Sequence, residues 1–327
     1  MPAGASDGLN FPAERPVPLE ELVALVGQRV DILGEVSGLV VGAVAPAHCA
    51  ASGALSFVMG GAAKTLALLQ SAPLPKRCVL AVGLSAAQAE PLAASGATII
   101  CARNPRLWFI EAVRHLFPGA DKPGHSISEQ ASVAPGAEVG GECYVGPFAV
   151  IDRGARVGAG STIHPGVHIG RNVVLGRKVI VQSNSAVGAI GQSSEKNAAG
   201  QHISLPHLGA VVIGDESRIG ANTTIIRGSL QNTRIGARCS IGNQVNVGHN
   251  CEIGDDAFIS AGSVLCGSCK VGQGCWIAPG VIILNKVRIG NQAMIGLGTI
   301  VRHDVEAGQF VAGDPPRVLR KLNRYNE

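Results

Sequence analysis

Aromatic residues are scarce in this chain of 327 residues. Phenylalanine, tryptophan and tyrosine together make up 3% of the sequence, whereas hydrophobic residues of all kinds make up 46%. Most globular cores use aromatic side chains to fill large volumes. The scarcity therefore predicts a core of stacked aliphatic side chains, chiefly valine and isoleucine.

Charged residues are also few, at 15% of the sequence, and the net charge is only +4. The chain contains no run of lysine and arginine. Binding of nucleic acid depends on clustered basic side chains, so a nucleic-acid partner is not expected. A substrate that carries phosphate remains compatible with this charge.

The sequence lacks the patterns of a secretory signal and of a membrane span. No basic segment precedes an apolar stretch near the N-terminus. Residues 36–63 contain no Asp, Glu, Lys or Arg, but Pro46, His48 and several serines and glycines interrupt them. A spanning helix needs a more uniformly apolar run. We therefore expect a cytoplasmic protein.

A six-residue repeat dominates the second part of the chain. Aliphatic residues occupy every sixth position from Val133 to Val187 and from Ile213 to Ile225, and after a four-residue slip in phase from Ile235 to Val301. Neither a helix nor a simple alternating strand has this period. Six residues suffice for one short strand and its corner, so each aliphatic residue stacks on its counterpart eighteen residues later. The repeat predicts a parallel β-helix of triangular cross-section.

The residue four places after each aliphatic position is mostly small, as a narrow prism requires. Five of the nine cysteines fall in this second inward position. An odd number of cysteines cannot all pair, and the Cys266–Cys269 spacing lacks the second pair that a structural zinc site needs. We therefore expect no metal, and we expect these five cysteines to be buried packing residues: Cys143, Cys239, Cys251, Cys269 and Cys275.

The predicted architecture is mainly β, with a small α/β domain before the β-helix. Residues 1–15 are expected to be a flexible tail, 16–121 an α/β domain, 122–311 the β-helix and 312–327 a short C-terminal cap. Helical spacing covers residues 18–26 and 107–116, and buried strands are expected at 78–82 and 97–101. Residues 188–212 interrupt the repeat and are expected to leave the prism as a loop; the smaller slip at 226–234 predicts a corner bulge.

His249 is the strongest candidate for a catalytic group. It follows the repeat position Val247 by two residues, which places it near a face of the prism. A neutral imidazole can remove a proton from an attacking amine or hydroxyl group. The backbone N–H of Gly267, eighteen residues later, lies one coil away and could stabilise an oxyanion. On spacing alone, an ordinary surface histidine is the competing interpretation.

Several segments resemble the UDP-3-O-acylglucosamine N-acyltransferases, a family within the hexapeptide-repeat acyltransferases. The signature lies in residues 219–230 and 243–250, and the resemblance extends to residues 203–209, 55–58 and 103–105. It implies a left-handed β-helix, although parallel crossovers are otherwise nearly always right-handed. It also implies a homotrimeric enzyme of lipid A biosynthesis, without a bound cofactor, that moves a 3-hydroxyacyl group from acyl carrier protein to the amine of a UDP-linked sugar.

The resemblance assigns roles to individual residues. His249 is expected to be the general base, Asn250 to support it, and the Gly267 amide to donate to the oxyanion. Phe57 would stack on uracil. The residues expected to bind substrate are Phe57, Asn104, Gln192, His202, His207 and Asn246.

The chain also departs from the family pattern. Ile226 stands where the family has aspartate, Lys286 where a histidine is expected, and Gly60 and Ala63 where two nucleotide contacts are expected. The tail at residues 313–318 instead resembles acetyltransferases that use coenzyme A. An acetyl-coenzyme A-dependent enzyme acting on another nucleotide amino sugar is therefore one alternative. A non-catalytic β-helix scaffold is another, against which the retained His249 argues.

Overall fold

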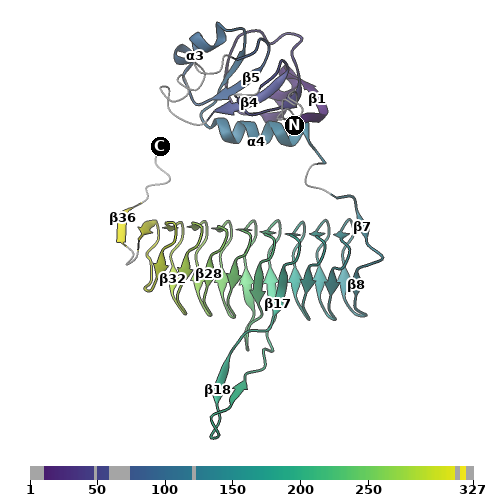
Figure 1. Cartoon of the computed structure of the whole chain (residues 1–327), viewed down its shortest axis with the longest axis vertical. Coiled ribbons are helices and arrows are strands. Elements are labelled where there is room, and N and C mark those ends of the chain that lie inside the picture. Colours follow the sequence, from purple (N-terminus) through teal and green to yellow (C-terminus); the bar gives the residue numbers. More distant parts are fainter. Residues whose placement is uncertain (1–10, 48–49, 59–73, 120–122, 314–316, 322–327) are drawn as a thin grey trace, which may run out of the picture. The chain divides into compact units, whose positions relative to one another are not determined.

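The chain folds into two compact units, residues Met1–Lys122 and Pro123–Glu327 (Figure 1). A computed structural model describes residues 11–47, 50–58, 74–119, 123–313 and, for the backbone, 317–321. In this described part, no helix has the length and apolar character needed to cross a bilayer.

The first unit contains a six-stranded mixed sheet in the order β1-β3-β4-β5-β6-β2. Strands β3 to β6 run parallel, and β1 and β2 add to the two edges in the antiparallel sense. The strands are β1 Phe11–Pro18, β2 Asp31–Leu33, β3 Val40–Val44, β4 Ala54–Val58, β5 Val79–Val82 and β6 Thr98–Cys101. The helices are α1 Leu19–Val26, α3 Ala86–Ala93 and α4 Pro105–Leu116.

Both predicted helices and both predicted strands of this unit are present. Helix α1 ends at Gly27, whose φ of 68° is the left-handed conformation that glycine adopts readily. Helix α4 begins earlier than predicted, because Asn104 caps it: its side chain accepts a hydrogen bond from the Leu107 N–H. The flexible tail expected over residues 1–15 is wrong in its second part, since residues 11–15 belong to β1, of which Phe11 and Pro12 pair with β3.

The second unit is a left-handed parallel β-helix built from three long sheets. The first sheet contains β7 Ser126–Ile127, β10 Tyr144–Val145, β13 Thr162–Ile163, β16 Ile180–Val181, β21 Arg218–Ile219, β24 Ser240–Ile241, β27 Phe258–Ile259, β30 Trp276–Ile277, β33 Met294–Ile295, β35 Gln309–Ala312 and β36 Arg317–Lys321. The second contains β8 Ser132–Val133, β11 Val150–Ile151, β14 His168–Ile169, β17 Ala186–Ala189, β22 Thr224–Ile226, β25 Asn246–Val247, β28 Val264–Leu265, β31 Ile282–Ile283 and β34 Ile300–Val301. The third contains β9 Glu138–Val139, β12 Arg156–Val157, β15 Val174–Leu175, β20 Val211–Ile213, β23 Thr233–Ile235, β26 Glu252–Ile253, β29 Lys270–Val271 and β32 Arg288–Ile289.

The six-residue repeat supplies the interior of the prism, as predicted. Ile259 pairs in register with Ile277 on the next coil, and both are fully buried. The five cysteines of the small register are buried, which confirms their packing role. Burial raises the pKa of the Cys275 thiol to about 11, so this thiol stays protonated. The inward residues of the first coil are less buried than those of later coils. Ile127, for example, is 52% exposed.

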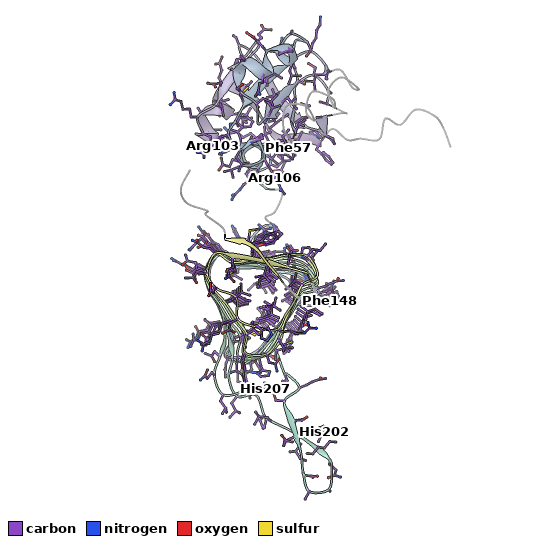
Figure 2. All side chains as sticks on the ribbon, turned by 90° about the vertical axis from the view of Figure 1, so that its left-hand side faces the viewer. Phe57, Arg103, Arg106, Phe148, His202 and His207 are labelled. Atoms are coloured by element: carbon purple, nitrogen blue, oxygen red, sulfur yellow. The ribbon has the colours of Figure 1, made fainter. Side chains whose placement is uncertain are left out.

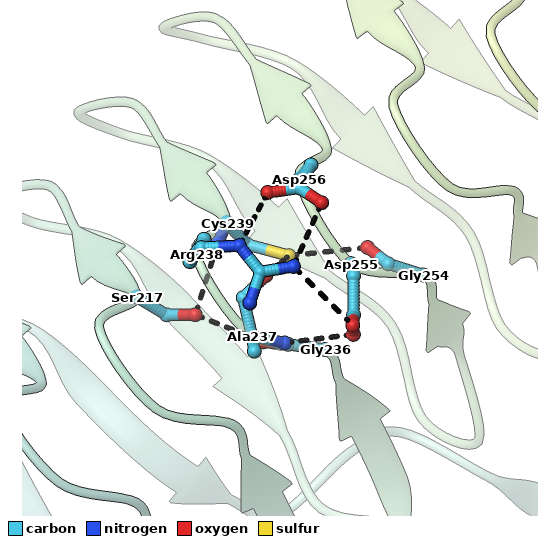
Figure 3. Close-up of polar contacts among 8 residues, drawn as sticks. All are labelled: Ser217, Gly236, Ala237, Arg238, Cys239, Gly254, Asp255 and Asp256. Atoms are coloured by element: carbon cyan, nitrogen blue, oxygen red, sulfur yellow. Dashed lines mark hydrogen bonds and ion pairs between the residues drawn. The ribbon is translucent and has the colours of Figure 1, made fainter.

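Side chains close the corners between coils (Figure 3). Asp255 accepts a hydrogen bond from the Ala237 N–H at 2.9 Å through its Oδ1 atom, one coil away. The Arg238 guanidinium donates to both carboxylate oxygens of Asp256, at 2.7 and 2.9 Å. Such bonds satisfy backbone and charged groups that the corner would otherwise leave unpaired.

Both predicted interruptions leave the regular coil. The larger one carries a two-stranded antiparallel hairpin of β18 Ser194–Lys196 and β19 His202–Ser204, which projects from the prism (Figure 1). The smaller one joins β22 to β23. At the end of the prism, β35 continues the first sheet in parallel and β36 folds back antiparallel to it.

Candidate functional site

The predicted base lies at the corner between the second and third sheets, directly after β25. His249 is half-buried there, and its Nδ1 atom lies 2.9 Å from Oδ1 of Asn250. Asn250 occupies the left-handed region, with φ of 60°, which asparagine tolerates better than most residues. This backbone turn places the two side chains side by side.

The loop at the smaller interruption holds the Asn250 side chain in one orientation. Its Oδ1 atom accepts a hydrogen bond from the Ser229 N–H at 3.2 Å, and its Nδ2 donates to the Gln231 carbonyl at 3.3 Å. Oδ1 is therefore an acceptor, so Nδ1 of His249 must carry the proton in their contact. In the neutral ring, the lone pair is then on Nε2.

Gly267 lies directly against this Nε2 atom. A Cβ atom added at residue 267 would stand 2.5 Å from Nε2 of His249, so only glycine leaves room for the ring. Within the described residues, the N–H of Gly267 has no hydrogen-bond partner. At four other corners the corresponding amide donates to a side chain one coil later, as when Ala221 donates to Asn243 at 2.8 Å.

His207 lies beside His249 at the base of the larger interruption (Figure 2). Their ring centroids are 5.9 Å apart and the ring planes are inclined at 74°. His207 is only 6% exposed, and its Nδ1 atom contacts the Leu205 carbonyl at 3.0 Å. The structure therefore brings a second imidazole to the predicted base.

Arg227 fixes the base of the larger interruption to the prism. Its buried guanidinium donates to the carbonyl of Gly209 at 2.7 Å and to that of Arg171 at 2.9 Å. Burial lowers the pKa of Arg227, and the nearby Arg171 charge lowers it further. These bonds make the backbone around His207 a defined part of the corner.

Three other predicted substrate residues surround this corner less closely. Asn246 is half-buried on β25 of the second sheet, and Gln192 is exposed in the segment that leads into the hairpin. His202 lies farther out, on β19, where its Nδ1 contacts the Ser194 hydroxyl at 3.1 Å (Figure 2). Of these three residues, His202 therefore has a hydrogen-bond partner within the hairpin itself.

The two predicted residues of the first unit already have structural partners. The Phe57 ring packs on Phe109 of α4 at 4.5 Å between centroids, and the Asn104 side chain caps α4. Gly60 and Ala63, the altered nucleotide contacts, lie outside the described residues. A cavity of about 650 Å³ opens nearby in the chain, at the carboxyl ends of β5 and β6, and is lined by Arg29, Asp31 and Arg103 among others.

Sequence reasoning missed the residues that support Asn250. Thr233 accepts a hydrogen bond from the Asn250 N–H at 2.9 Å and donates to the Ile226 carbonyl at 2.7 Å. The slip in the repeat marked this loop as irregular, but no spacing connected it to the base. The contact of this loop with Asn250 depends on the path of the loop, which the six-residue repeat does not describe.

Two family models match the prism. The model described as bacterial transferase hexapeptide (six repeats) matches residues 232–267, and the model described as hexapeptide repeat of succinyl-transferase matches residues 149–183 and 252–285. Among solved structures, a UDP-N-acetylglucosamine O-acyltransferase from Moraxella catarrhalis superposes with a TM-score of 0.56 at 23% identity, covering 61% of this chain and 75% of that one. This likeness shows the fold.

Curated relatives extend over both units. A UDP-3-O-acylglucosamine N-acyltransferase from Cupriavidus metallidurans is 32% identical over 264 residues, which are 73% of this chain and 69% of that protein. The protein of the same name from Cupriavidus taiwanensis is 28% identical, covering 70% of this chain and 69% of its own length. The chain is therefore an acyltransferase that belongs to the UDP-3-O-acylglucosamine N-acyltransferase family.

Proposed function

We propose that this chain transfers an acyl group, expected to be a 3-hydroxyacyl group, from a thioester to the amine of a UDP-linked amino sugar, as in lipid A biosynthesis. The observation that carries the proposal is the oriented pair of His249 and Asn250. Because Asn250 accepts through Oδ1, His249 presents an unprotonated Nε2 atom to the substrate. The scaffold alternative gives no reason for this arrangement.

In the proposed reaction, His249 Nε2 removes a proton from the amine as its nitrogen attacks the thioester carbonyl carbon. A C–N bond forms, and the carbonyl oxygen becomes an oxyanion that accepts a hydrogen bond from the Gly267 N–H, which has no partner among the described residues. Collapse of this intermediate breaks the C–S bond. The imidazolium returns its proton to the departing sulfur, so that a thiol and an amide are the products.

The acyl donor is less well defined than the sugar acceptor. The relatives support an acyl thioester, and the tail at residues 313–318 resembles that of coenzyme A-dependent enzymes. We propose acyl carrier protein as the carrier of the acyl group. An assay that offers the same acyl group on acyl carrier protein and on coenzyme A separates the two readings, because a strong preference for coenzyme A would favour the alternative enzyme.

The nucleotide is proposed to bind the first unit. Ligands of open parallel sheets bind outside the carboxyl ends of the strands. The cavity there carries the cationic side chains of Arg29 and Arg103, which suit the phosphates of a nucleotide. Phe57 retains its proposed contact with uracil only if the face opposite Phe109 is free.

A homotrimer and a cytoplasmic location belong to the same proposal. Ile190, Leu208 and Leu230 are at least 67% exposed around the corner that carries His249. Exposed apolar side chains in one area are typical of a protein interface. Sedimentation of the purified protein should therefore give the mass of a trimer.

Replacement of His249 by alanine tests the proposed reaction. We expect kcat to fall at least about 100-fold, because general base catalysis contributes roughly that much or more. The unfolding temperature should stay near that of the wild type, since the ring is only half-buried. Near-normal turnover of the His249→Ala variant would refute the mechanism.

A further inference from the structure

The helices that follow β5 and β6 cover opposite faces of the sheet in the first unit. The buried side chains of α4 pack in the core that contains Val79 and Ile100, whereas those of α3 pack in the core that contains Leu80 and Ile99. Where the connections of two neighbouring parallel strands diverge in this way, a crevice opens at the carboxyl ends of the strands, and ligands bind there. The cavity of about 650 Å³ lies at this point, and its volume is ordinary for a small-molecule site.

Two cationic side chains and one carboxylate line this crevice. Arg29 and Asp31 come from the segment that leads into β2, and Arg103 comes from the connection between β6 and α4. All three residues are exposed, so a ligand can reach them. Arginine donors suit phosphate oxygens, and a carboxylate accepts hydrogen bonds from ribose hydroxyls. These charges together fit a ribose joined to a diphosphate.

Strand pairing holds Asp31 beside the crevice. Asp31 pairs with Cys101, the last residue of β6, in the antiparallel sense. Burial raises the pKa of the Cys101 thiol, and the charge of Asp31 raises it further, which places the carboxylate near this thiol. Cys101 itself lines the cavity. The carboxylate therefore lies at the edge of the crevice.

Phe57 lies on a different part of the same sheet. It pairs with Ala81, two residues before Gly83, which lines the cavity after β5. Its ring packs on Phe109, against the core that α4 covers. Among the described residues, the cavity lining does not include Phe57. The crevice therefore offers a nucleotide a binding surface that does not depend on this ring.

We propose that the nucleotide is held in this crevice by its ribose and diphosphate, with Arg29 and Arg103 on the phosphates and Asp31 on the ribose hydroxyls. Phe57 is then a packing residue of the core under α4 and not the platform for uracil. The inference rests on the proposed function, because it takes the nucleotide of the acceptor sugar as the ligand. It assigns the recognition of that nucleotide to three charged residues and away from the base.

Calorimetric titration of the full chain with UDP tests the two arginines. We expect Arg29→Gln and Arg103→Gln each to weaken UDP binding by about 10-fold or more, since each removes a charge-assisted hydrogen bond to phosphate. Phe57→Leu should bind UDP within about threefold of the wild type, because it removes no contact with the ligand. Arg114→Gln is the matched control, since Arg114 is exposed in the last turn of α4, and it should keep the wild-type affinity.

Asp31→Ala tests the ribose contact separately. The wild type should bind 2′,3′-dideoxyuridine diphosphate, which lacks both ribose hydroxyls, about 10-fold more weakly than UDP. Asp31→Ala should bind the two ligands equally. Its affinity for UDP should fall less than that of the arginine variants, because the substitution also removes a negative charge beside the phosphates. An Asp31→Ala variant that keeps the wild-type preference for UDP would overturn the ribose contact.

Unfolding temperatures and the acyl-transfer assay keep the outcomes distinct. The three charged residues are exposed, so their variants should unfold near the wild-type temperature. Arginine variants within twofold of the wild-type affinity, or a Phe57→Leu variant that loses more than tenfold at an unchanged unfolding temperature, would overturn the inference and leave the proposed function intact. A wild-type protein that binds UDP but transfers no acyl group would instead contradict the proposed function, and the titrations would still decide the role of the crevice.

Discussion

The contact between Gly267 and His249 leads to a prediction that separates catalysis from folding. In the Gly267→Ala variant, the new Cβ atom would stand 2.5 Å from His249 Nε2. An ordinary contact needs about 3.4 Å, so the ring must retreat by roughly 0.9 Å. The new methyl group would meet the side chain of His249, which can turn away without moving the backbone.

The expected cost to catalysis is large. A displacement of about 1 Å in a catalytic group lowers the rate by around 100-fold. We expect kcat/KM of Gly267→Ala to fall by that order, although alanine retains the N–H that is proposed to stabilise the oxyanion. The loss would thus report on the position of the base rather than on the amide donor.

The expected cost to stability is small. The ring loses at most its hydrogen bond to Asn250, worth about 0.5–1.5 kcal/mol. That corresponds to a decrease of only a few degrees in the unfolding temperature. Gly248→Ala makes the contrasting case, because its Cβ would meet the Gly267 backbone nitrogen at 2.7 Å and the chain itself would have to move.

Steady-state kinetics and thermal unfolding of these variants, with Gly141→Ala as control, test the reasoning together. A Gly267→Ala enzyme within threefold of the wild-type kcat/KM would show that His249 does not act from its observed position. An unfolding temperature as low as that of Gly248→Ala would show that the backbone, and not the ring, absorbs the methyl group.

Two further predictions concern stability. Ile259→Ala, at a fully buried position, should lower the free energy of unfolding by about 2–5 kcal/mol in a urea titration. Ile282→Ala, on the outer face of the second sheet, should lower it by less than about 1 kcal/mol. Equal losses in the two variants would contradict the inward stacking of the repeat. Hydrogen bonds from Arg238 lower the pKa of Asp256 below its ordinary value of 3.8, so the folded protein gains stability above that pH and loses it as the pH falls through the lowered pKa. Asp256→Asn should therefore reduce the dependence of stability on pH below about pH 4, and an unchanged acid profile would mean that the exposed pair contributes nothing.

The prism was predictable because its sequence is locally consistent. Each hexad meets the same requirement, one large inward aliphatic residue and one small one, so the pattern carries the fold without knowledge of distant contacts. Strand β1 shows the opposite case. It contains Pro12, Pro16 and Pro18 and has no alternating pattern, and it exists because β3 pairs with it from elsewhere in the chain. Prolines are tolerated there because β1 is an edge strand.

The site was predictable only in part. The signature motif singled out His249 and Asn250, but the orientation of Asn250 depends on Ser229 and Gln231, in a loop that breaks the repeat. The approach of His207 to Gly191 likewise depends on how the larger interruption returns to the prism. Both contacts join residues whose separation in the sequence follows no period, so only the folded chain brings them together.

The same corner position explains how a structural repeat can carry a reactive group. At four other corners, the second residue after an aliphatic position is an Asp or Asn that accepts a hydrogen bond from the amide one coil below, as Asp255 and Asn243 do. At this corner the position holds His249 and, one coil later, Gly267. The glycine has no side chain with which to occupy the amide below it, and it leaves room for the imidazole ring. Glycine at this position thus leaves the His249 amide without a side-chain cap and admits the base, while the neighbouring inward residues Val247 and Leu265 stay fully buried.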